Sequence, residues 1–118
     1  MEYVYTYNEL ERDIKALKQA HPDIPIYIIG NSREGRSLYA FKIGNGTRRI
    51  FFNGAHHGME WLTSKLLMQF AAELADGTYD SEVSPDSYAL YVAPMVNPDG
   101  VEIASDGKRW QANSAGVE

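Results

Sequence analysis

The sequence predicts an α/β fold, a mixed sheet with flanking helices, from three observations. Apolar residues recur at helical spacing in two segments, and short runs rich in β-branched and aromatic residues lie between and after them. The second helical segment falls between two strand segments, the order of a βαβ unit, which implies parallel neighbours and a right-handed crossover. With 118 residues and 44% hydrophobic content, the chain is long enough to bury a core as a single domain, residues 1–118.

The first expected element is a helix over residues 7–20. Leu10, Ile14 and Leu17 are spaced by four and three positions, which places them on one face. Thr6 precedes the segment and is the candidate N-cap. We therefore expect this helix to pack on the sheet through one apolar stripe.

Two strands are expected next, over residues 25–30 and 37–43. Both segments contain the β-branched or aromatic residues that strands favour, and the segment 31–36 between them is polar and contains a glycine. The pair is expected to form an antiparallel hairpin.

The βαβ unit occupies the middle of the chain. Residues 49–53 contain an apolar run typical of a strand buried on both faces, residues 61–75 are expected to be a helix, and residues 88–96 a second strand. Glycine, proline and acidic residues mark 76–87 as a surface loop. The broad buried face of the helix is expected to include Leu62, Leu66, Phe70 and Leu74, alongside Leu67 and Ala71.

Charge and composition exclude several classes of function. The net charge of -5 and the pI near 5.1 argue against a nucleic-acid partner, since such proteins usually carry a basic patch. The chain has no cysteine, so neither a disulfide nor a thiolate metal site is expected. No signal peptide and no transmembrane segment is evident, so no membrane partner is expected, and the bacterial cytoplasm and an exported location both stay open.

The motif His57-Gly58-Met59-Glu60 comes soon after the predicted strand at 49–53. Its spacing lets the imidazole of His57 and the carboxylate of Glu60 reach one metal ion, and zinc accepts both donor types. A catalytic zinc needs three protein ligands and an open position for water. No histidine follows His57 in this sequence, so we expect the chain to be the front part of an enzyme.

Both candidate ligands have a structural alternative. His57 taken alone is consistent with a surface or helix-capping histidine, and Glu60 with a residue that complements the helix dipole or completes a capping box. His56 is expected to point elsewhere, because neighbouring side chains diverge in extended chain.

The segment Asn97-Pro98-Asp99-Gly100 follows the last predicted strand. Sites in open α/β sheets lie at the carboxyl ends of strands, so this segment is expected close to His57. Asn97 and Asp99 are the candidates for substrate binding, with a tight turn that shapes the site as the preferred interpretation of the segment.

Five segments in order give the chain a resemblance to a known family. They are Tyr5-Thr6-Tyr7 with Leu10, Gly30-Asn31-Ser32 with Gly35-Arg36-Ser37, residues 53–61, residues 94–101, and Arg109-Trp110-Gln111-Ala112-Asn113 followed by Gly116-Val117-Glu118. With these segments the chain resembles the bacterial zinc carboxypeptidases, and most closely their γ-D-glutamyl-L-diamino acid endopeptidase branch. A lone His-x-x-Glu pattern is weak evidence, whereas five segments in this order are strong evidence.

The resemblance implies the N-terminal part of a zinc-peptidase (phosphorylase/hydrolase-like) fold, with Zn²⁺ as cofactor and His57 and Glu60 as the first two zinc ligands. The family's third ligand, a later histidine, and its general-base glutamate have no counterpart here, so the chain alone is expected to be inactive. The digestive carboxypeptidases carry arginine at the positions of Met59 and Gln111, which argues against simple C-terminal carboxypeptidase specificity. Gln111 and Arg109 are the candidate catalytic residues, as donors to the oxyanion.

The function that the resemblance implies is zinc-dependent hydrolysis of peptide bonds, with peptidoglycan stem peptides as the substrate class of the closest branch. Two alternatives stay open, a non-catalytic binding or regulatory module on the same scaffold and a truncated fragment without an independent role. Self-association is also expected, because a sheet cut midway leaves an unpaired edge and an uncovered apolar face.

Overall fold

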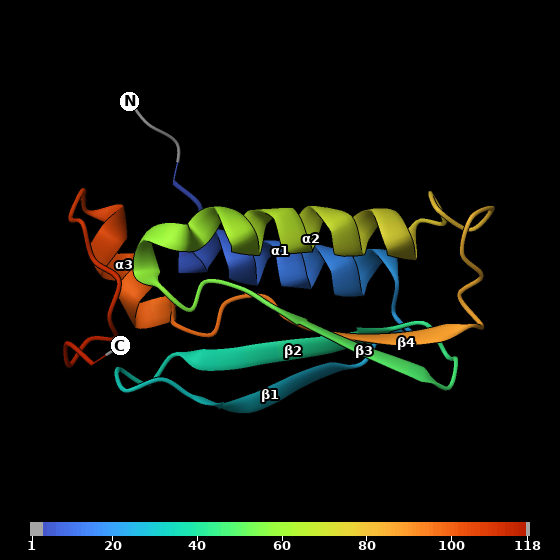
Figure 1. Cartoon of the computed structure of the whole chain (residues 1–118), viewed down its shortest axis with the longest axis horizontal. Helices are drawn as coiled ribbons and strands as arrows, with labels where there is room; N and C mark the ends of the chain where they lie inside the picture. The colour runs from blue at the N-terminus through green and yellow to red at the C-terminus, as the bar shows by residue number, and fades with distance from the viewer. Residues whose placement is uncertain (1–3, 118) are drawn as a thin grey trace.

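The computed structural model describes residues 4–117, which form one four-stranded sheet with its helices (Figure 1). In chain order the elements are α1 (Tyr7–Ala20), β1 (Ile26–Asn31), β2 (Ser37–Ile43), β3 (Arg48–Asn53), η1 (Gly58–Glu60), α2 (Trp61–Ala75), β4 (Tyr88–Ala93) and α3 (Pro98–Ser105). None of the helices in this described part is long and apolar enough to cross a membrane. The α/β class and the mixed sheet predicted from the sequence are confirmed.

The sheet has the strand order β1-β2-β4-β3. β1 and β2 form the predicted antiparallel hairpin, β2 and β4 are also antiparallel, and β3 runs parallel to β4. α2 connects the two parallel strands, so β3, α2 and β4 are the predicted βαβ unit. The parallel pair runs in register from Arg48 beside Tyr88 to Asn53 beside Ala93. The residues that follow Asn53 and Ala93 therefore lie at the same edge of the sheet.

Both long helices lie on the same face of the sheet, as Figure 1 shows. α1 buries Leu10, Ile14 and Leu17, as its spacing predicts, in one core cluster with Phe41 of β2 and Met68 of α2. α3 stands at the end of the sheet, where it contacts η1 (Figure 1). This arrangement places α3 beside the motif that follows β3.

α1 begins and ends at the predicted residues. The Thr6 hydroxyl accepts a hydrogen bond from the Glu9 N–H, and the Glu9 carboxylate accepts one from the Thr6 N–H, so the two residues form a capping box. At the other end, His21 Nε2 lies 2.7 Å from Asp76 Oδ1. This contact joins the C-terminal ends of α1 and α2.

The segment after β4, predicted as a turn, is instead the start of helix α3. Asn97 is the N-cap, its side-chain oxygen accepts the Gly100 N–H at 3.1 Å, and Pro98 lies in the first turn. Asparagine and proline are common both at helix starts and in turns, so the sequence pattern does not separate the two. β4 itself ends at Ala93, earlier than predicted, because Pro94 has no N–H to donate to the sheet.

β3 is not buried on both faces, which corrects the sequence prediction. It is an edge strand that pairs with β4 alone among the strands of residues 4–117, and Phe51 and Phe52 are 58% and 41% exposed. The Phe52 ring faces the helices and lies 6.3 Å from the Phe70 ring of α2, while Phe51 points to the opposite face of the sheet. An apolar run predicts a strand but does not say how many elements cover it.

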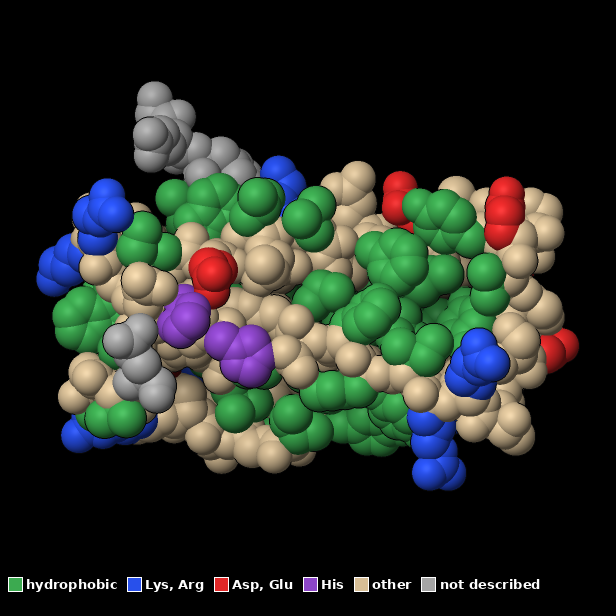
Figure 2. All heavy atoms as spheres, viewed as in Figure 1, with side chains coloured by type: hydrophobic (Ala, Val, Ile, Leu, Met, Phe, Trp, Pro, Cys, Tyr) green, Lys and Arg blue, Asp and Glu red, His purple; other side chains and the backbone are tan. Residues whose placement is uncertain are grey.

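The predicted buried face of α2 is confirmed in its C-terminal part, where Ala71 is buried and Leu67, Phe70 and Leu74 pack against the core, and wrong at Leu62 and Leu66. Its buried residues are Ser64, Met68 and Ala71, whereas Leu62 and Leu66 are 51% and 55% exposed. Positions four apart drift around a helix with 3.6 residues per turn, so the predicted stripe leaves the core at its N-terminal half. Figure 2 shows hydrophobic side chains gathered on the face of the molecule where β3 forms the edge, with histidine side chains beside them.

Candidate metal centre

The chain leaves β3 through a strained turn that begins the motif loop, which we define as residues 54–60. Ala55 has φ of 55°, a left-handed conformation that costs a non-glycine residue about 1 to 2 kcal/mol, and it is buried. Thr63 of α2 stabilises the turn, because its Oγ1 accepts the Ala55 N–H and donates to the Glu60 carbonyl, both at 2.7 Å. The motif loop is therefore fastened near both ends to the first turn of α2.

His57 and Glu60 meet on the surface of the motif loop. His57 Nδ1 and Glu60 Oε1 are 2.9 Å apart, and the two side chains are 43% and 53% exposed. The 3-10 turn of η1 causes this approach, since side chains three positions apart lie on the same side of such a turn. Neither side chain makes the hydrogen bond of a helix cap. The capping box is therefore absent, Glu60 still lies at the N-terminus of α2, and the role of the two residues as metal ligands stays a prediction.

The donor pair fits zinc in kind and nearly in spacing. Zinc binds imidazole nitrogen and carboxylate oxygen at about 2.0 to 2.2 Å, so two such ligands in a tetrahedral site lie about 3.3 Å apart. The observed 2.9 Å between Nδ1 and Oε1 is a hydrogen bond between the two side chains, and zinc would take the place of the proton that they share, with a small increase in this distance. Within residues 4–117, no group of three or more His, Cys, Asp or Glu side chains is placed to hold a metal ion. His57 and Glu60 are therefore two candidate ligands without a third among the described residues.

Asn97 connects the motif loop with two other segments. Its Nδ2 donates to the carbonyl oxygen of His56 at 3.1 Å, and to those of Gln111 and Ala112 at 3.3 and 3.0 Å. Its Oδ1 accepts the Gly100 N–H. The prediction that Asn97 lies near the motif is confirmed, and its side chain is engaged with the backbone.

Gly58 lets α3 approach the motif loop closely. A Cβ atom on Gly58 would lie 2.3 Å from the Gly100 carbonyl oxygen and 2.9 Å from that of Trp110. The Gly58 N–H also donates to the Gln111 carbonyl at 3.1 Å. The sequence analysis did not predict this close contact between Gly58 and α3. The only sign of it in the sequence is the presence of glycine at this position.

Asp99 is 2% exposed and has partners for both carboxylate oxygens. Its Oδ1 accepts from Ser32 Oγ and from Arg36 Nη1, each at 2.8 Å, and its Oδ2 accepts the Glu34 N–H at 2.9 Å. Burial by itself raises the pKa of Asp99, but the hydrogen bonds from Arg36, the Glu34 N–H and Ser32, with the Arg36 charge, outweigh it and hold the pKa below its ordinary value. Asp99 therefore fastens α3 to the turn between β1 and β2.

This placement differs from the candidate role that the sequence suggested for Asp99. Asp99 was a candidate for substrate contact, whereas its carboxylate lies inside the fold and is fully engaged there. Arg36, the partner of Asp99, lies 63 positions away from it along the chain. No local pattern signals an ion pair at such a separation.

Comparison with known proteins identifies the family. The sequence profile described as zinc carboxypeptidase matches residues 10–116. The chain belongs to the zinc carboxypeptidase family. His57 and Glu60 both fall within the matched range, and the resemblance found from the sequence is confirmed.

Two curated relatives of this zinc carboxypeptidase chain show how much of a longer protein it matches. The γ-D-glutamyl-L-diamino acid endopeptidase 1 of Lysinibacillus sphaericus is 33% identical over 111 residues, which are 87% of this chain and 28% of the relative. Carboxypeptidase B of Rattus norvegicus is 34% identical over 100 residues, which are 77% of this chain and 24% of the relative. The chain thus spans about a quarter of the length of these two relatives.

Solved structures show the fold. Bovine thrombin-activatable fibrinolysis inhibitor, in its complex with tick carboxypeptidase inhibitor, has a TM-score of 0.82 at 23% identity over 94% of this chain and 37% of that one. Carboxypeptidase A of Helicoverpa armigera has a TM-score of 0.79 at 21% identity over 93% of this chain and 29% of that one. The zinc carboxypeptidase chain therefore has part of the carboxypeptidase fold.

Arg109 and Gln111 of this zinc carboxypeptidase chain lie in the segment that adjoins the motif loop. The Gln111 carbonyl accepts from both the Gly58 N–H and the Asn97 amide. Both side chains are exposed, and neither hydrogen-bonds to another residue in the part of the chain that the structure describes. Their predicted role as donors to the oxyanion stays a prediction.

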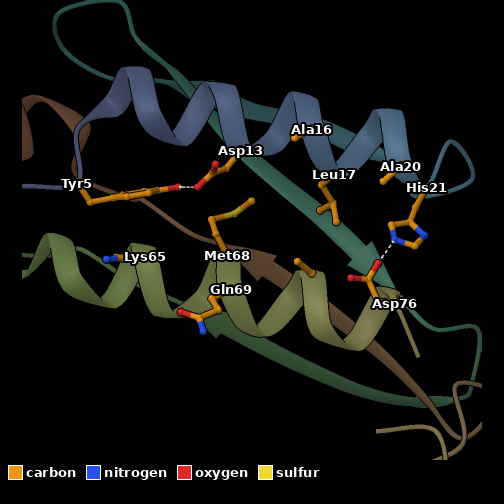
Figure 3. Close-up of a pocket in the computed structure, with 11 residues that line it drawn as sticks. Tyr5, Asp13, Ala16, Leu17, Ala20, His21, Lys65, Met68, Gln69 and Asp76 are labelled. Carbon is orange, nitrogen blue, oxygen red and sulfur yellow. Dashed lines mark hydrogen bonds and ion pairs between the residues drawn. The ribbon is translucent and has the colours of Figure 1, made fainter. Parts of the chain in front are cut away.

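A groove between α1 and α2 is separate from the motif loop. It has a volume of about 380 Å³, and Lys65 is among the residues that line it. Figure 3 shows a pair of side chains in contact toward each end of the groove, Tyr5 with Asp13 at 2.6 Å and His21 with Asp76 at 2.7 Å. Neither candidate metal ligand lines this groove. We therefore place the candidate chemistry of this zinc carboxypeptidase chain at the motif loop.

Proposed function

We propose that this chain carries the first part of the active site of a zinc-dependent peptidase, with His57 and Glu60 as two of the protein ligands. The 2.9 Å approach of His57 Nδ1 to Glu60 Oε1 on an exposed loop is the observation that supports it most, in a chain of the zinc carboxypeptidase family. We also propose that residues 1–118 form one domain-like part of a larger catalytic domain, in line with the length of the relatives.

In the proposed site, a bound zinc would polarise the scissile carbonyl and lower the pKa of a bound water to about 7. His57 and Glu60 hold the donor atoms, and η1 keeps them on one side of the motif loop. We assign the oxyanion to Arg109, which would offer a charged donor, and to Gln111, which would offer a neutral one. The third ligand and the general base are proposed to come from outside the described residues.

Peptides are the proposed substrates, with peptidoglycan stem peptides as the class. This proposal is supported by the 33% identity to an enzyme named γ-D-glutamyl-L-diamino acid endopeptidase 1. Met59 and Gln111 carry no positive charge. At these two positions a free C-terminal carboxylate would therefore find no cationic partner, which favours a substrate cleaved at an internal bond.

Zinc titration of the isolated chain, by competition with a chromogenic chelator, tests the proposed ligands. We expect weak binding by the wild-type chain and at least about tenfold weaker binding by His57→Ala or Glu60→Gln, since each change removes one of two donors. His56→Ala is the matched control, because His56 is the neighbouring imidazole and hydrogen-bonds through Nε2 to Asn53. A His57→Ala variant with wild-type affinity would contradict the proposal.

The same samples are expected to show negligible peptidase activity, because two ligands do not complete a catalytic zinc shell. Chelator-sensitive cleavage of a γ-D-glutamyl-diaminopimelate bond by this chain alone would show that this expectation is wrong. A wild-type chain that binds no zinc at all would favour the non-catalytic module on the same scaffold.

We further propose that the isolated chain self-associates through the edge formed by β3. Phe51 and Phe52 are 58% and 41% exposed on the two faces of that edge strand. We expect dimers or larger species by light scattering, and Phe51→Lys to shift the chain to monomer. The matched control is Ile28→Lys, at a residue 63% exposed on β1 at the opposite edge. A monomeric wild-type chain at high concentration would contradict the proposal.

A further inference from the structure

The peptide groups on both sides of His57 are held by hydrogen bonds. The carbonyl of His56, in the preceding peptide, accepts from Asn97 Nδ2 at 3.1 Å. The N–H of Gly58, in the following peptide, donates to the Gln111 carbonyl at 3.1 Å. The two peptide planes fix the direction of the Cα–Cβ bond between them, so these contacts set the direction in which the His57 side chain leaves the backbone, and the contact with Glu60 then orients the ring.

Asn97 controls both of these contacts. Besides the His56 carbonyl, its Nδ2 donates to the carbonyls of Gln111 and Ala112 at 3.3 and 3.0 Å, so it holds the segment that receives the Gly58 N–H. Its own N–H donates to the Ala55 carbonyl at 3.1 Å, at the strained turn that opens the motif loop. Asn97 thus aligns the motif loop with the segment that packs against it, through its side chain and its backbone N–H.

Asn97 has little freedom to move away from this position. A Cβ atom on Gly100 would lie 2.4 Å from Asn97 Nδ2 and 2.5 Å from the Ala112 carbonyl, so the backbone is packed tightly around the amide. Two residues further along the chain, Asp99 is fixed by Arg36 and Ser32 at 2.8 Å each. The start of α3 is therefore anchored to the β1–β2 turn.

We propose that Asn97 is a positioning residue for the two candidate zinc ligands, His57 and Glu60. Asn97 sets the direction of the His57 side chain through the backbone, and Asp99 holds Asn97 in place. The inference rests on the proposed function where it concerns zinc. The positioning of His57 is a property of the metal-free chain. Asn97 acts on the site without contacting the metal or a substrate.

Two variants separate positioning from the capping of α3. Asn97→Ala removes both the amide donor and the acceptor of the Gly100 N–H. Asn97→Asp keeps the acceptor, since aspartate caps helices as well as asparagine does, but it replaces the donor by oxygens that face three carbonyls. Tyr7→Phe is the control for a lost hydrogen bond elsewhere, because Tyr7 donates to the Ser37 carbonyl at 2.7 Å.

The first measurement is made without metal, by NMR on the folded chain. In both Asn97 variants, we expect the Gly58 amide to exchange with solvent at least about tenfold faster and the ring signals of His57 to move, because the loop is released on both sides of His57. Tyr7→Phe should leave both observables unchanged. Wild-type exchange at Gly58 in either Asn97 variant, or recovery in Asn97→Asp, would overturn the inference.

The second measurement is the zinc titration on the same variants, with ZnCl₂ alone as the probe. We expect both Asn97 variants to bind zinc about tenfold more weakly than the wild-type chain, as for other residues that orient metal ligands. A wild-type chain that binds no zinc, with Gly58 released in Asn97→Asp, would refute the proposed function and support the positioning role. Unchanged zinc affinity in both Asn97 variants of a zinc-binding chain would overturn the inference.

Discussion

Asp99→Ala is expected to lower the free energy of unfolding by about 3 kcal/mol or more, because it breaks a buried ion pair from one side. The Arg36 side chain, 33% exposed, keeps part of its hydration, which places the expected cost at the low end for such pairs. Ser32 Oγ and the Glu34 N–H also lose their acceptor. Urea denaturation followed by tryptophan fluorescence measures the change.

The matched control for this prediction is a pair of charge-neutralising variants. Asp99→Asn is expected to destabilise the chain by about 2 kcal/mol, since an amide cannot accept all the hydrogen bonds that the carboxylate accepts. Asp86→Asn makes the same change at an exposed position in the loop before β4 and should stay within about 0.5 kcal/mol of wild type. Equal stabilities of the two variants would show that the Asp99 contacts contribute nothing.

The Asp99 carboxylate also determines whether acid raises or lowers the free energy of unfolding. The pKa of Asp99 in the folded chain lies below its ordinary value of 3.8. Its stabilisation is therefore fully present above the unfolded-state pKa, near 3.9, and is lost as the pH falls through the lower folded-state pKa. The difference in unfolding free energy between wild type and Asp99→Asn should stay constant from pH 7 to about pH 5 and shrink below about pH 4. A difference that grows on acidification would contradict this assignment.

Local sequence patterns predicted the bounds of the helices and strands better than they predicted which residues are buried. The bounds of α1 and β2 agree with the prediction, because capping by Thr6 and the spacing of apolar residues act over a few positions. The burial of β3 and of Leu62 and Leu66 was predicted wrongly. An apolar pattern reports that a residue can be buried, whereas actual burial depends on which other elements lie against it.

The candidate site likewise has features that the sequence predicted and one that it did not. The approach of His57 to Glu60 follows from one turn of chain, so the spacing alone predicts it. The neighbourhood of Asn97 followed from topology, because the parallel strands β3 and β4 end at the same edge. The partner of Asp99 followed from neither, since the ion pair to Arg36 joins segments that no periodicity relates.

Gly58→Ala is expected to have a comparably large effect, for steric reasons alone. The new Cβ would lie 2.3 Å from the Gly100 carbonyl oxygen and 2.9 Å from the Trp110 carbonyl oxygen, and backbone atoms cannot rotate aside as the end of a long side chain can. Relief of the overlap requires α3 or the motif loop to move. We expect a loss of about 3 kcal/mol in the free energy of unfolding, the upper end for overpacking.

This displacement should also change the relative position of His57 and Glu60. Moving the motif loop away from α3 stretches the Gly58 N–H to Gln111 carbonyl bond and turns the backbone that carries His57. Zinc affinity is therefore expected to fall together with stability. Gly30→Ala is the control, because its Cβ would meet the Leu38 side chain at 3.8 Å, an ordinary contact. A folded Gly58→Ala chain that matches Gly30→Ala in both stability and zinc affinity would show that the close approach of α3 does not shape the site.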